Sequence, residues 1–201
     1  MSKAMWDEIF SSETYQYGEA PNQFIYEMVT KKELGGVVAC FAEGEGRNAN
    51  FFASRGADVT AFDQSLVGLE KAHKLAEKNG HSIIIHQCDL VNDVIPYQAF
   101  DTAINVFGHV HESEQEAFFN NMISAVKPGG HFLFEVYSEK QIDYKTGGPR
   151  NKAILYDPAL LFKVIGHHDI LHFYCGEAER VEGEKHTGLC HVVQGVIRIC
   201  E

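Results

Sequence analysis

The sequence lacks the long apolar segments that membrane and secreted proteins carry. No apolar run approaches the ~20 residues that a membrane-spanning helix needs. The first residues include Trp6, Asp7 and Glu8, where a signal peptide would have a long apolar core. We therefore expect a cytoplasmic protein that does not insert into membranes.

Basic residues are also scarce. The 28 Asp and Glu residues outnumber the 17 Lys and Arg residues, which gives a formal net charge of −11, and no basic run is longer than Lys31-Lys32. Because polyphosphate partners need clustered Lys and Arg, we expect no nucleic acid partner. The same charge disfavours anionic membrane surfaces.

The cysteines form no recognisable pattern. They are odd in number, widely spaced and without a C-x-x-C pair, at Cys40, Cys88, Cys175, Cys190 and Cys200. This pattern predicts neither a disulfide framework nor a zinc site. We expect free, buried thiols in a reducing compartment and no bound metal.

A glycine turn follows the most apolar part of the first third of the chain. The apolar run 37–42 breaks at Gly44 and Gly46 and is followed by the helical segment that starts near Ala49. A buried parallel strand reads as a short apolar run, and a strand that leaves a sheet into a helix over glycines places free N–H groups beside a ligand. The turn therefore predicts a ligand-binding site.

A second short strand, 58–63, ends in an acid. Asp63 follows Gly46 by about 17 residues, close to the spacing of about 20 at which an acid binds ribose hydroxyls in dinucleotide folds. Next, Ser65 is a good N-cap for a helix over 66–79. The two segments together predict a nucleoside-binding site.

The glycine pattern favours one nucleoside cofactor over another. A nicotinamide fold needs a third glycine to seat a pyrophosphate, and here Arg47, Asn48 and Ala49 follow Gly46. The run 44–49 resembles motif I of the class I S-adenosylmethionine (SAM) methyltransferases, and most of all their tellurite-resistance-type branch. Many members have an acid and a glycine where this chain has Cys40 and Ala42. We expect Glu43 to take over the polar role of that acid.

Further motifs extend this resemblance over nearly the whole chain. Lys127-Pro128-Gly129-Gly130 ends a helix predicted over 113–126 and precedes a strand at 131–137, as in class I methyltransferases. In the tellurite-resistance-type branch, stretches similar to 17–22, 144–149 and 186–188 also occur. The last two lie in predicted loops, as candidates for substrate contact or for fixing loop shape.

The resemblance implies an α/β, Rossmann-like class I methyltransferase fold. We expect a single domain over 1–201, with a seven-stranded, mainly parallel sheet, an antiparallel carboxyl-terminal strand and helices on both faces. Alternation in 169–182 and 188–200 predicts the closing hairpin. Residues 1–34 would form an amino-terminal lid segment and helix, 35–137 the cofactor-binding core, and 138–201 the substrate-side loop and hairpin. Residues 1–20 show no clear helical period, but their aromatics predict packing over the domain.

The resemblance also implies the cofactor, SAM, and its contacts. The segment 42–46 would hold the methionine end, Asp63 the ribose and Asp89 the adenine. The full set of expected cofactor contacts is Ala42, Glu43, Gly44, Gly46, Asn48, Asp63, Gln64, Ser65, Asp89, Leu90 and Asn105. The alternative for Asp89 is an acid that caps a turn.

Two residues are candidates for the methyl-transfer end of the site. His109 and His111 follow a strand over 100–107, at the sheet edge where open α/β folds bind ligands. A neutral imidazole could accept a proton from a substrate or hold it in place. We select His109 and Tyr17 as the catalytic candidates. The alternatives are an exposed loop histidine and a packing aromatic.

The sequence thus predicts a SAM-dependent methyltransferase that acts on a small nucleophile, such as a thiol or a chalcogen oxyanion, by in-line methyl transfer. We expect a monomer or a homodimer. The alternatives are a nicotinamide oxidoreductase, a methyltransferase with a protein or RNA substrate, and a SAM-binding sensor or partner subunit without catalysis. The departures at Cys40 and Ala42 keep the last alternative open.

Overall fold

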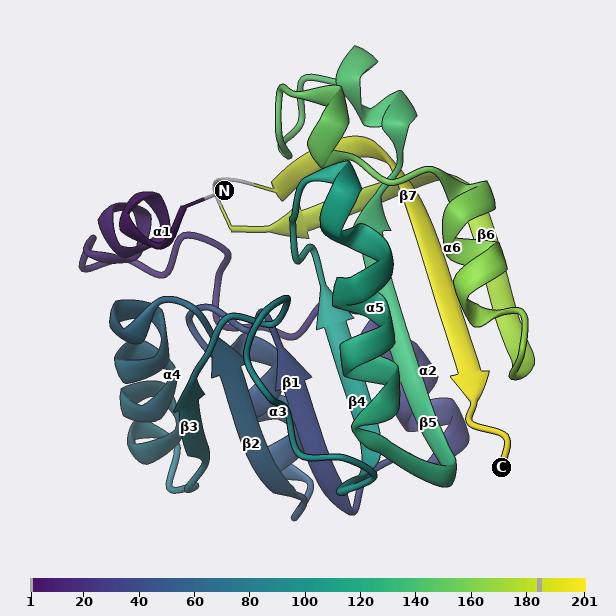
Figure 1. Cartoon of the computed structure of the whole chain (residues 1–201). Coiled ribbons are helices and arrows are strands. Elements are labelled where there is room, and N and C mark those ends of the chain that lie inside the picture. The colour runs from purple at the N-terminus through teal and green to yellow at the C-terminus, as the bar shows by residue number, and fades with distance from the viewer. Residues whose placement is uncertain (1, 184–185) are drawn as a thin grey trace.

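A computed structural model describes residues 2–183 and 186–201. Its seven strands form one sheet in the order β3-β2-β1-β4-β5-β7-β6 (Figure 1). Strands β1 to β5 are parallel, and β7 runs antiparallel to both of its neighbours. This confirms the predicted fold class. The strands are β1 Val37–Phe41, β2 Asp58–Asp63, β3 Ile84–Gln87, β4 Phe100–Val106, β5 Val126–Tyr137, β6 Asp169–Glu182 and β7 His186–Arg198.

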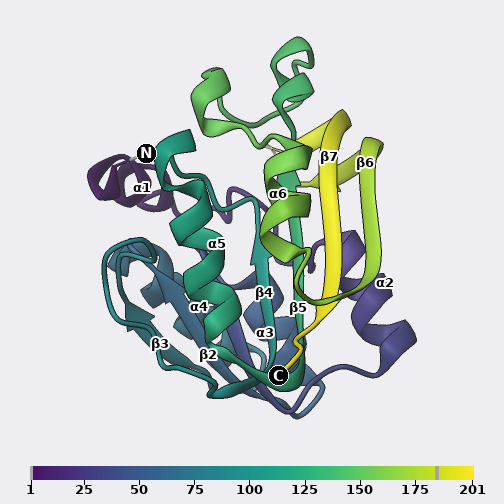
Figure 2. The same ribbon diagram turned by 45° about the vertical axis from the view of Figure 1, so that its right-hand side comes forward.

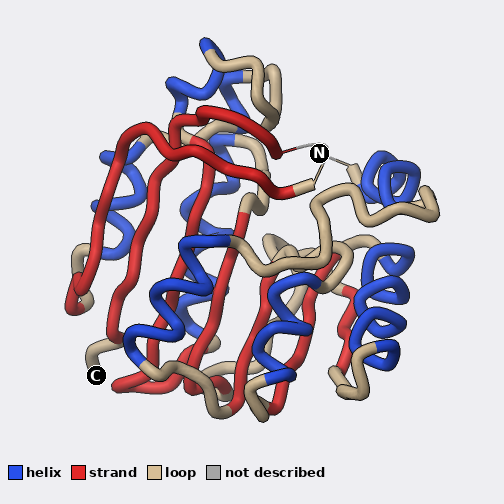
Figure 3. Tube along the Cα trace, turned by 180° about the vertical axis from the view of Figure 1, so that it is seen from behind, coloured by secondary structure: helices blue, strands red, loops and turns tan. Residues whose placement is uncertain are grey.

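Helices cover both faces of the sheet, which Figures 2 and 3 show from two further directions. Helices α2 to α4 bury apolar side chains such as Ile25, Phe52 and Leu69 against one face, and α5 and α6 bury Phe119 and Leu161 against the other. The helices are α1 Lys3–Phe10, α2 Gln23–Lys32, α3 Arg47–Ser54, α4 Leu66–Lys78, α5 Gln115–Ser124 and α6 Pro158–Ile165, with short 3₁₀ helices η1 Glu112–Glu114, η2 Glu139–Asp143 and η3 Lys152–Ile154.

Helix α1 is the element that the sequence did not predict. The Ser2 side chain accepts a hydrogen bond from the Met5 N–H and so begins the helix. Because α1 has two turns, its apolar residues Trp6, Ile9 and Phe10 are too few to give a helical period that can be read from sequence. The helix packs against α4, and Ser65 Oγ donates to Asp7 Oδ1 at 2.6 Å. The amino-terminal segment does pack over the domain, as expected.

The Lys127–Gly130 segment is a bulge inside β5, where the sequence predicted a turn before the strand. The register jumps from Phe100 paired with Val126 to Thr102 paired with His131. A Cβ atom on Gly130 would lie 2.7 Å from the Asp101 carbonyl oxygen, so the strands approach too closely here for a side chain. Helix α5 is correspondingly shorter than predicted, since Val126 already belongs to β5.

The predicted hairpin of β6 and β7 is present, and β7 starts two residues earlier than expected. Glu184 and Lys185, which the prediction placed in its turn, lie outside the described residues. The expectation that all five cysteines are buried is wrong for Cys175 and Cys200, which are exposed near the sheet edge and the carboxyl terminus. Within the described ranges, no helix has the length and apolar character to cross a membrane.

Candidate functional site

A cavity of about 420 Å³ opens at the carboxyl ends of the parallel strands. Its walls come from α1, the glycine turn after β1, the tip of β2, the loops after β3 and β4, and residues 147–149. A volume of this size is typical of a small-molecule site. Its place at the strand ends is where open α/β sheets bind their ligands.

The two glycines of the turn after β1 have different structural roles. Ala42, Gly44 and Gly46 all have positive φ angles, of 49°, 61° and 92°. Gly44 lines the cavity, and a Cβ atom on it would lie 2.9 Å from the Phe10 ring. Gly46 does not line the cavity, and its Cβ atom would lie 2.5 Å from the Ala72 backbone. Gly46 therefore allows α3 and α4 to pack closely.

Glu43 serves the helix that follows the turn. The N-cap position of α3 is Gly46, which has no side chain to offer. Glu43 Oε1 instead accepts from the N–H groups of Asn48 at 2.9 Å and Ala49 at 2.8 Å. A carboxylate at this place also interacts favourably with the helix dipole. Burial nevertheless raises the pKa of Glu43 to about 7.

Asp63 ties the tip of β2 to the glycine turn. Its two carboxylate oxygens accept from the N–H of Gly44 at 2.9 Å and from the N–H of Ser65 at 2.8 Å. Burial raises the pKa of Asp63 to about 6. Both Asp63 and the adjacent Gln64 line the cavity. Ser65 does not, because its hydroxyl caps α4 at Gly68 and bonds Asp7.

Asp89 caps a turn and also lines the cavity. Its carboxylate caps the turn after β3, accepting from the Val91 N–H at 2.9 Å and from Asn92 Nδ2 at 2.8 Å. It also lines the cavity together with Leu90. A turn-capping acid is thus held at the edge of the site with its orientation fixed.

Asn48 and Asn105 occupy different positions. Asn48 lines the cavity, and its Oδ1 accepts from the Asn22 N–H at 2.9 Å. Asn105 is fully buried beneath Gly108 and does not line the cavity. Neither polar atom of its amide has a partner within residues 2–183 and 186–201.

One end of the cavity, which we call the aromatic end, is lined by aromatic rings. The His186 ring lies 4.6 Å from the rings of both Tyr17 and Phe107, and 5.4 Å from Tyr137. The His109 ring stacks on Tyr137 at 5.9 Å. Of these five, all but Tyr137 line the cavity. The structure therefore brings the two catalytic candidates, Tyr17 and His109, into one cavity.

The titratable groups at this end are held in their uncharged forms. Burial lowers the pKa of His109 to about 3, and burial together with the Arg47 cation lowers the pKa of His186 well below its usual value. Burial raises the pKa of Tyr17 to about 12. His109 Nδ1 and His186 Nδ1 are buried and have no hydrogen-bond partner in the described part of the chain. His111 does not line the cavity and bonds Ser113.

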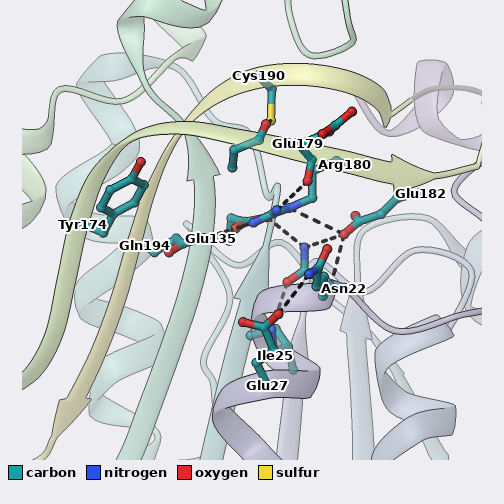
Figure 4. Close-up of polar contacts among 12 residues, drawn as sticks. Asn22, Ile25, Glu27, Glu135, Tyr174, Glu179, Arg180, Glu182, Cys190 and Gln194 are labelled. Carbon is teal, nitrogen blue, oxygen red and sulfur yellow. Dashed lines mark hydrogen bonds and ion pairs between the residues drawn. The ribbon is translucent and has the colours of Figure 1, made fainter.

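A buried polar network supports the wall behind this end (Figure 4). Glu135 on β5 forms an ion pair with Arg180 on β6 and accepts from Gln194 Nε2 on β7 at 2.6 Å. Asn22 Nδ2, at the start of α2, donates to Glu135 Oε1 at 2.8 Å. Three strands and the amino-terminal segment therefore meet at one carboxylate.

The network reaches the cavity through Arg47. Arg47 lines the cavity, and its Nη1 lies 2.6 Å from Glu182 Oε2. The other oxygen of Glu182 accepts from Asn22 Nδ2 at 2.9 Å. No local sequence pattern predicts this network, because its members are up to 160 positions apart.

Sequence reasoning also missed part of the cavity wall. Trp6 and Phe10 line it with their rings stacked at 5.4 Å, and they belong to the unpredicted helix α1. Residues 147–149 and His186 line it as well. The family motifs at 144–149 and 186–188 predicted these last two as candidates for substrate contact or for fixing loop shape.

Residues 38–130 match the model of a family described as a methyltransferase domain. A search of curated proteins gives no match. Residues 38–130 therefore carry a methyltransferase domain, and this match together with a neighbour of the same fold that holds SAH supports SAM as its cofactor. The resemblance to class I SAM-dependent methyltransferases seen in the sequence is confirmed, and the chain is an enzyme of the methyltransferase type.

Solved structures of similar fold agree with the family match. One describes the conversion of a disulfide bond into a thioacetal group during echinomycin biosynthesis. It has a TM-score of 0.81 and 16% identity over 98% of this methyltransferase and 91% of that chain. TehB from Haemophilus influenzae has a TM-score of 0.69 and 14% identity, and the match covers 98% of this chain and 66% of TehB. Magnesium protoporphyrin IX methyltransferase from Synechocystis PCC 6803, with bound SAH, has a TM-score of 0.62 and 15% identity. The match covers 98% of this chain and 83% of that enzyme.

The residues of the methyltransferase fit this cofactor. The volume suffices for a small molecule, and Gly44 lines the cavity at the turn, where its lack of a side chain admits the Phe10 ring. The Asp63 and Asp89 carboxylates line the cavity at the strand tips, where nucleoside hydroxyls and amines can be bound.

Proposed function

We propose that this methyltransferase transfers the methyl group of SAM to a small, soft nucleophile such as a thiol or a reduced chalcogen oxyanion. The observation that carries the proposal is the uncharged, weakly basic end of the cavity. His109, with a pKa of about 3, is a poor proton acceptor, and Tyr17, with a pKa of about 12, keeps its proton. A nucleophile that arrives already ionised, or ionises readily, needs neither.

The proposed cofactor contacts follow the cavity wall. The segment 42–46 holds the methionine end, Asp63 binds the ribose hydroxyls and Asp89 the adenine amine. When bound, SAM supplies an activated methyl group on a sulfonium that is itself the leaving group. The chain then has to hold the acceptor in line with that methyl group and keep water out. Tyr17 and His109 contact the acceptor, as hydrogen-bonding and packing groups.

The size of the cavity, about 420 Å³, supports a small acceptor. Trp6, Ile9 and Phe10 of α1 form part of its wall, and residues 147–149 form another part. We propose that residues 1–34 act as the lid segment and helix, 35–137 as the cofactor-binding core and 138–201 as the substrate side. We further expect a cytoplasmic monomer or homodimer that does not act on nucleic acid.

A reaction at sulfur is associated with the same fold. The neighbour from echinomycin biosynthesis is described by the conversion of a disulfide bond into a thioacetal group. At 16% identity this likeness is one of fold, and it makes thiols a reasonable first group of acceptors to test.

Calorimetric titration with SAM, S-adenosylhomocysteine (SAH) and NADH tests the cofactor, followed by methylation assays with small thiols and selenite. We expect micromolar binding of both adenosyl compounds, no binding of NADH, and transfer to at least one small acceptor. Cofactor binding with no transfer to any acceptor in a broad panel would instead favour a SAM-binding sensor or partner subunit.

A further inference from the structure

We propose that the aromatic end of the cavity is an acceptor subsite that selects thiols with an aromatic or apolar body, in which the sulfur is the one ionisable group, over acceptors with a further negative group, such as chalcogen oxyanions or carboxylated thiols. The inference rests on the proposed function, since it names the class of acceptor for the same site. The observations that carry it are the aromatic wall, the two imidazoles whose Nδ1 atoms have no partner in the described part of the chain, and the charges around the cavity.

The wall of the subsite is built for an apolar, polarisable body. His186 contacts Tyr17 at 4.6 Å with tilted rings and Phe107 at 4.6 Å edge to face. Val110 and Phe118 also line the cavity on this side. Aromatic faces and edges bind apolar and aromatic groups through dispersion and quadrupole contacts, and sulfur packs well against ring edges.

The polar atoms of the subsite are neutral. His109 and His186 are 8% and 7% exposed, both line the cavity, and the Nδ1 atom of each has no partner among residues 2–183 and 186–201. A buried polar atom without a partner is costly, so a ligand that bonds it is favoured. A neutral imidazole offers one donor and one acceptor. It can therefore orient a thiol, but it brings no positive charge for an anion.

The charges around the cavity also disfavour an anion. Of the described residues that line it, Arg47 is the one permanent cation, and Glu182 lies 2.6 Å from its Nη1. Five acids line the same cavity, at Glu43, Glu45, Asp63, Asp89 and Glu114. Glu45 pairs with Lys71, and burial raises the pKa of Glu43 and of Asp63, which leaves Asp89 and Glu114 as ordinary carboxylates with no cationic partner in the described part of the chain. A second negative group on the acceptor would face like charges with no free cation to bind it.

The transfer itself balances for a thiol. The acceptor loses its S–H proton to solvent, its sulfur forms a new bond to the methyl carbon, and the bond from that carbon to the sulfonium sulfur breaks. The electron pair of the broken bond stays on the sulfur of the leaving group, so the products are a thioether, SAH and a proton.

A matched pair of thiols tests the selection. Benzyl mercaptan and 4-(mercaptomethyl)benzoate share a thiol and a ring and differ by one carboxylate. We would measure the Kd of each for the SAH-loaded protein by calorimetry, and kcat/KM with SAM. We expect benzyl mercaptan to bind and react at least about tenfold better. Equal values, or a preference for the carboxylate, would overturn the proposal.

Two charge-reversal variants test whether a residue of the cavity causes the preference between the two thiols. Glu114 lines the cavity rim, whereas Glu112, two residues earlier in η1, is exposed and does not. We expect Glu114→Lys to narrow the preference for benzyl mercaptan by about fivefold, and Glu112→Lys to leave it unchanged. An equal effect of both variants would mean that overall charge, and not the subsite, sets the preference, and would overturn the proposal.

Binding and turnover separate this proposal from the proposed function. Selective binding of benzyl mercaptan to the SAH complex without methyl transfer would overturn the proposed function and support the subsite. Methylation of selenite, with no binding of benzyl mercaptan, would support the proposed function and overturn the subsite.

Discussion

The polar side chains at the two ends of the cavity differ in whether they have hydrogen-bond partners within the protein. At the end formed by the glycine turn and the strand tips, the carboxylates of Glu43, Asp63 and Asp89 all accept hydrogen bonds from nearby backbone N–H groups. At the aromatic end, the Nδ1 atoms of His109 and His186 have no partner in the described part of the chain. The first end is shaped by its own backbone, and the second leaves hydrogen-bonding capacity for a ligand.

This difference indicates which polar groups are already positioned before a ligand binds and which gain a hydrogen-bond partner only when it binds. Backbone groups hold the acids in place at the first end, so the ligand meets a fixed set of acceptors. At the aromatic end the positions are fixed by the Glu135 network and by ring packing, which leaves the imidazoles available. The following variants test this comparison.

The largest effect is expected from breaking the network behind the aromatic end. Glu135→Ala would remove the main ion-pair partner of the buried Arg180 guanidinium and leave it the Glu182 carboxylate at 3.8 Å. We expect a loss of about 3–5 kcal/mol in the free energy of unfolding, measured by urea denaturation. Glu139→Ala is the control, because the Glu139–Lys152 pair is exposed and we expect it to change stability by less than about 1 kcal/mol. Similar losses in both variants would show that the network does not hold the wall.

The second-largest effect is expected from Asp63, at the end of the cavity formed by the glycine turn and the strand tips. Asp63→Ala removes the carboxylate that we propose binds the ribose, and we expect SAM affinity to fall on the order of 100-fold in calorimetry. Asp58→Ala, at the exposed opposite end of β2, is the control and should leave affinity unchanged. Unchanged SAM affinity in a folded Asp63→Ala protein would show that the ribose lies elsewhere.

A smaller effect is expected at the aromatic end. His186→Leu removes the unpartnered Nδ1, and we expect KM for the acceptor to rise about tenfold, while SAH affinity stays within about twofold. His186→Asn keeps a polar atom near the Nδ1 position and should recover part of the loss. His111→Leu serves as the control, since His111 does not line the cavity. Loss of SAH affinity in His186→Leu would place His186 at the cofactor.

The smallest effect is a pH dependence of stability. The pKa of Glu43 in the folded protein is about 7, above the usual 4.5, so the folded state holds this proton more tightly than the unfolded chain does. Its contribution to stability is fully present below about pH 4.5 and is lost as the pH rises to about 7. The difference in unfolding free energy between the wild type and Glu43→Gln should therefore fall over this range. A flat profile for Glu43→Gln would indicate an ordinary pKa.

Much of the fold could be predicted from sequence because its signals are local. The apolar run of β1, the Ser65 cap of α4 and the alternation in β6 and β7 each depend on residues close in the chain. The errors have local causes too. Helix α1 is too short to show a period, and the bulge at Gly130 depends on how closely Asp101 on the next strand approaches.

The candidate site was predicted less completely than the fold. Ten of the thirteen predicted residues line one cavity, and Gly46, Ser65 and Asn105 do not. Position relative to a strand end shows that a residue is near the site, and it does not show which way a side chain points. Gly46 is the clearest case, since its freedom from a side chain serves the contact with Ala72 on α4.

The sequence by itself determined the methyltransferase fold and the cofactor turn, because hydrophobic period, glycine placement and strand-end acids are properties of short segments. The tertiary structure decided which groups carry charge and which lack partners. Burial sets the protonation of His109 and His186, and the Glu135 network joins residues from the start of α2 to β7. Desolvation and pairing depend on neighbours brought together by folding, and distance along the chain does not encode them.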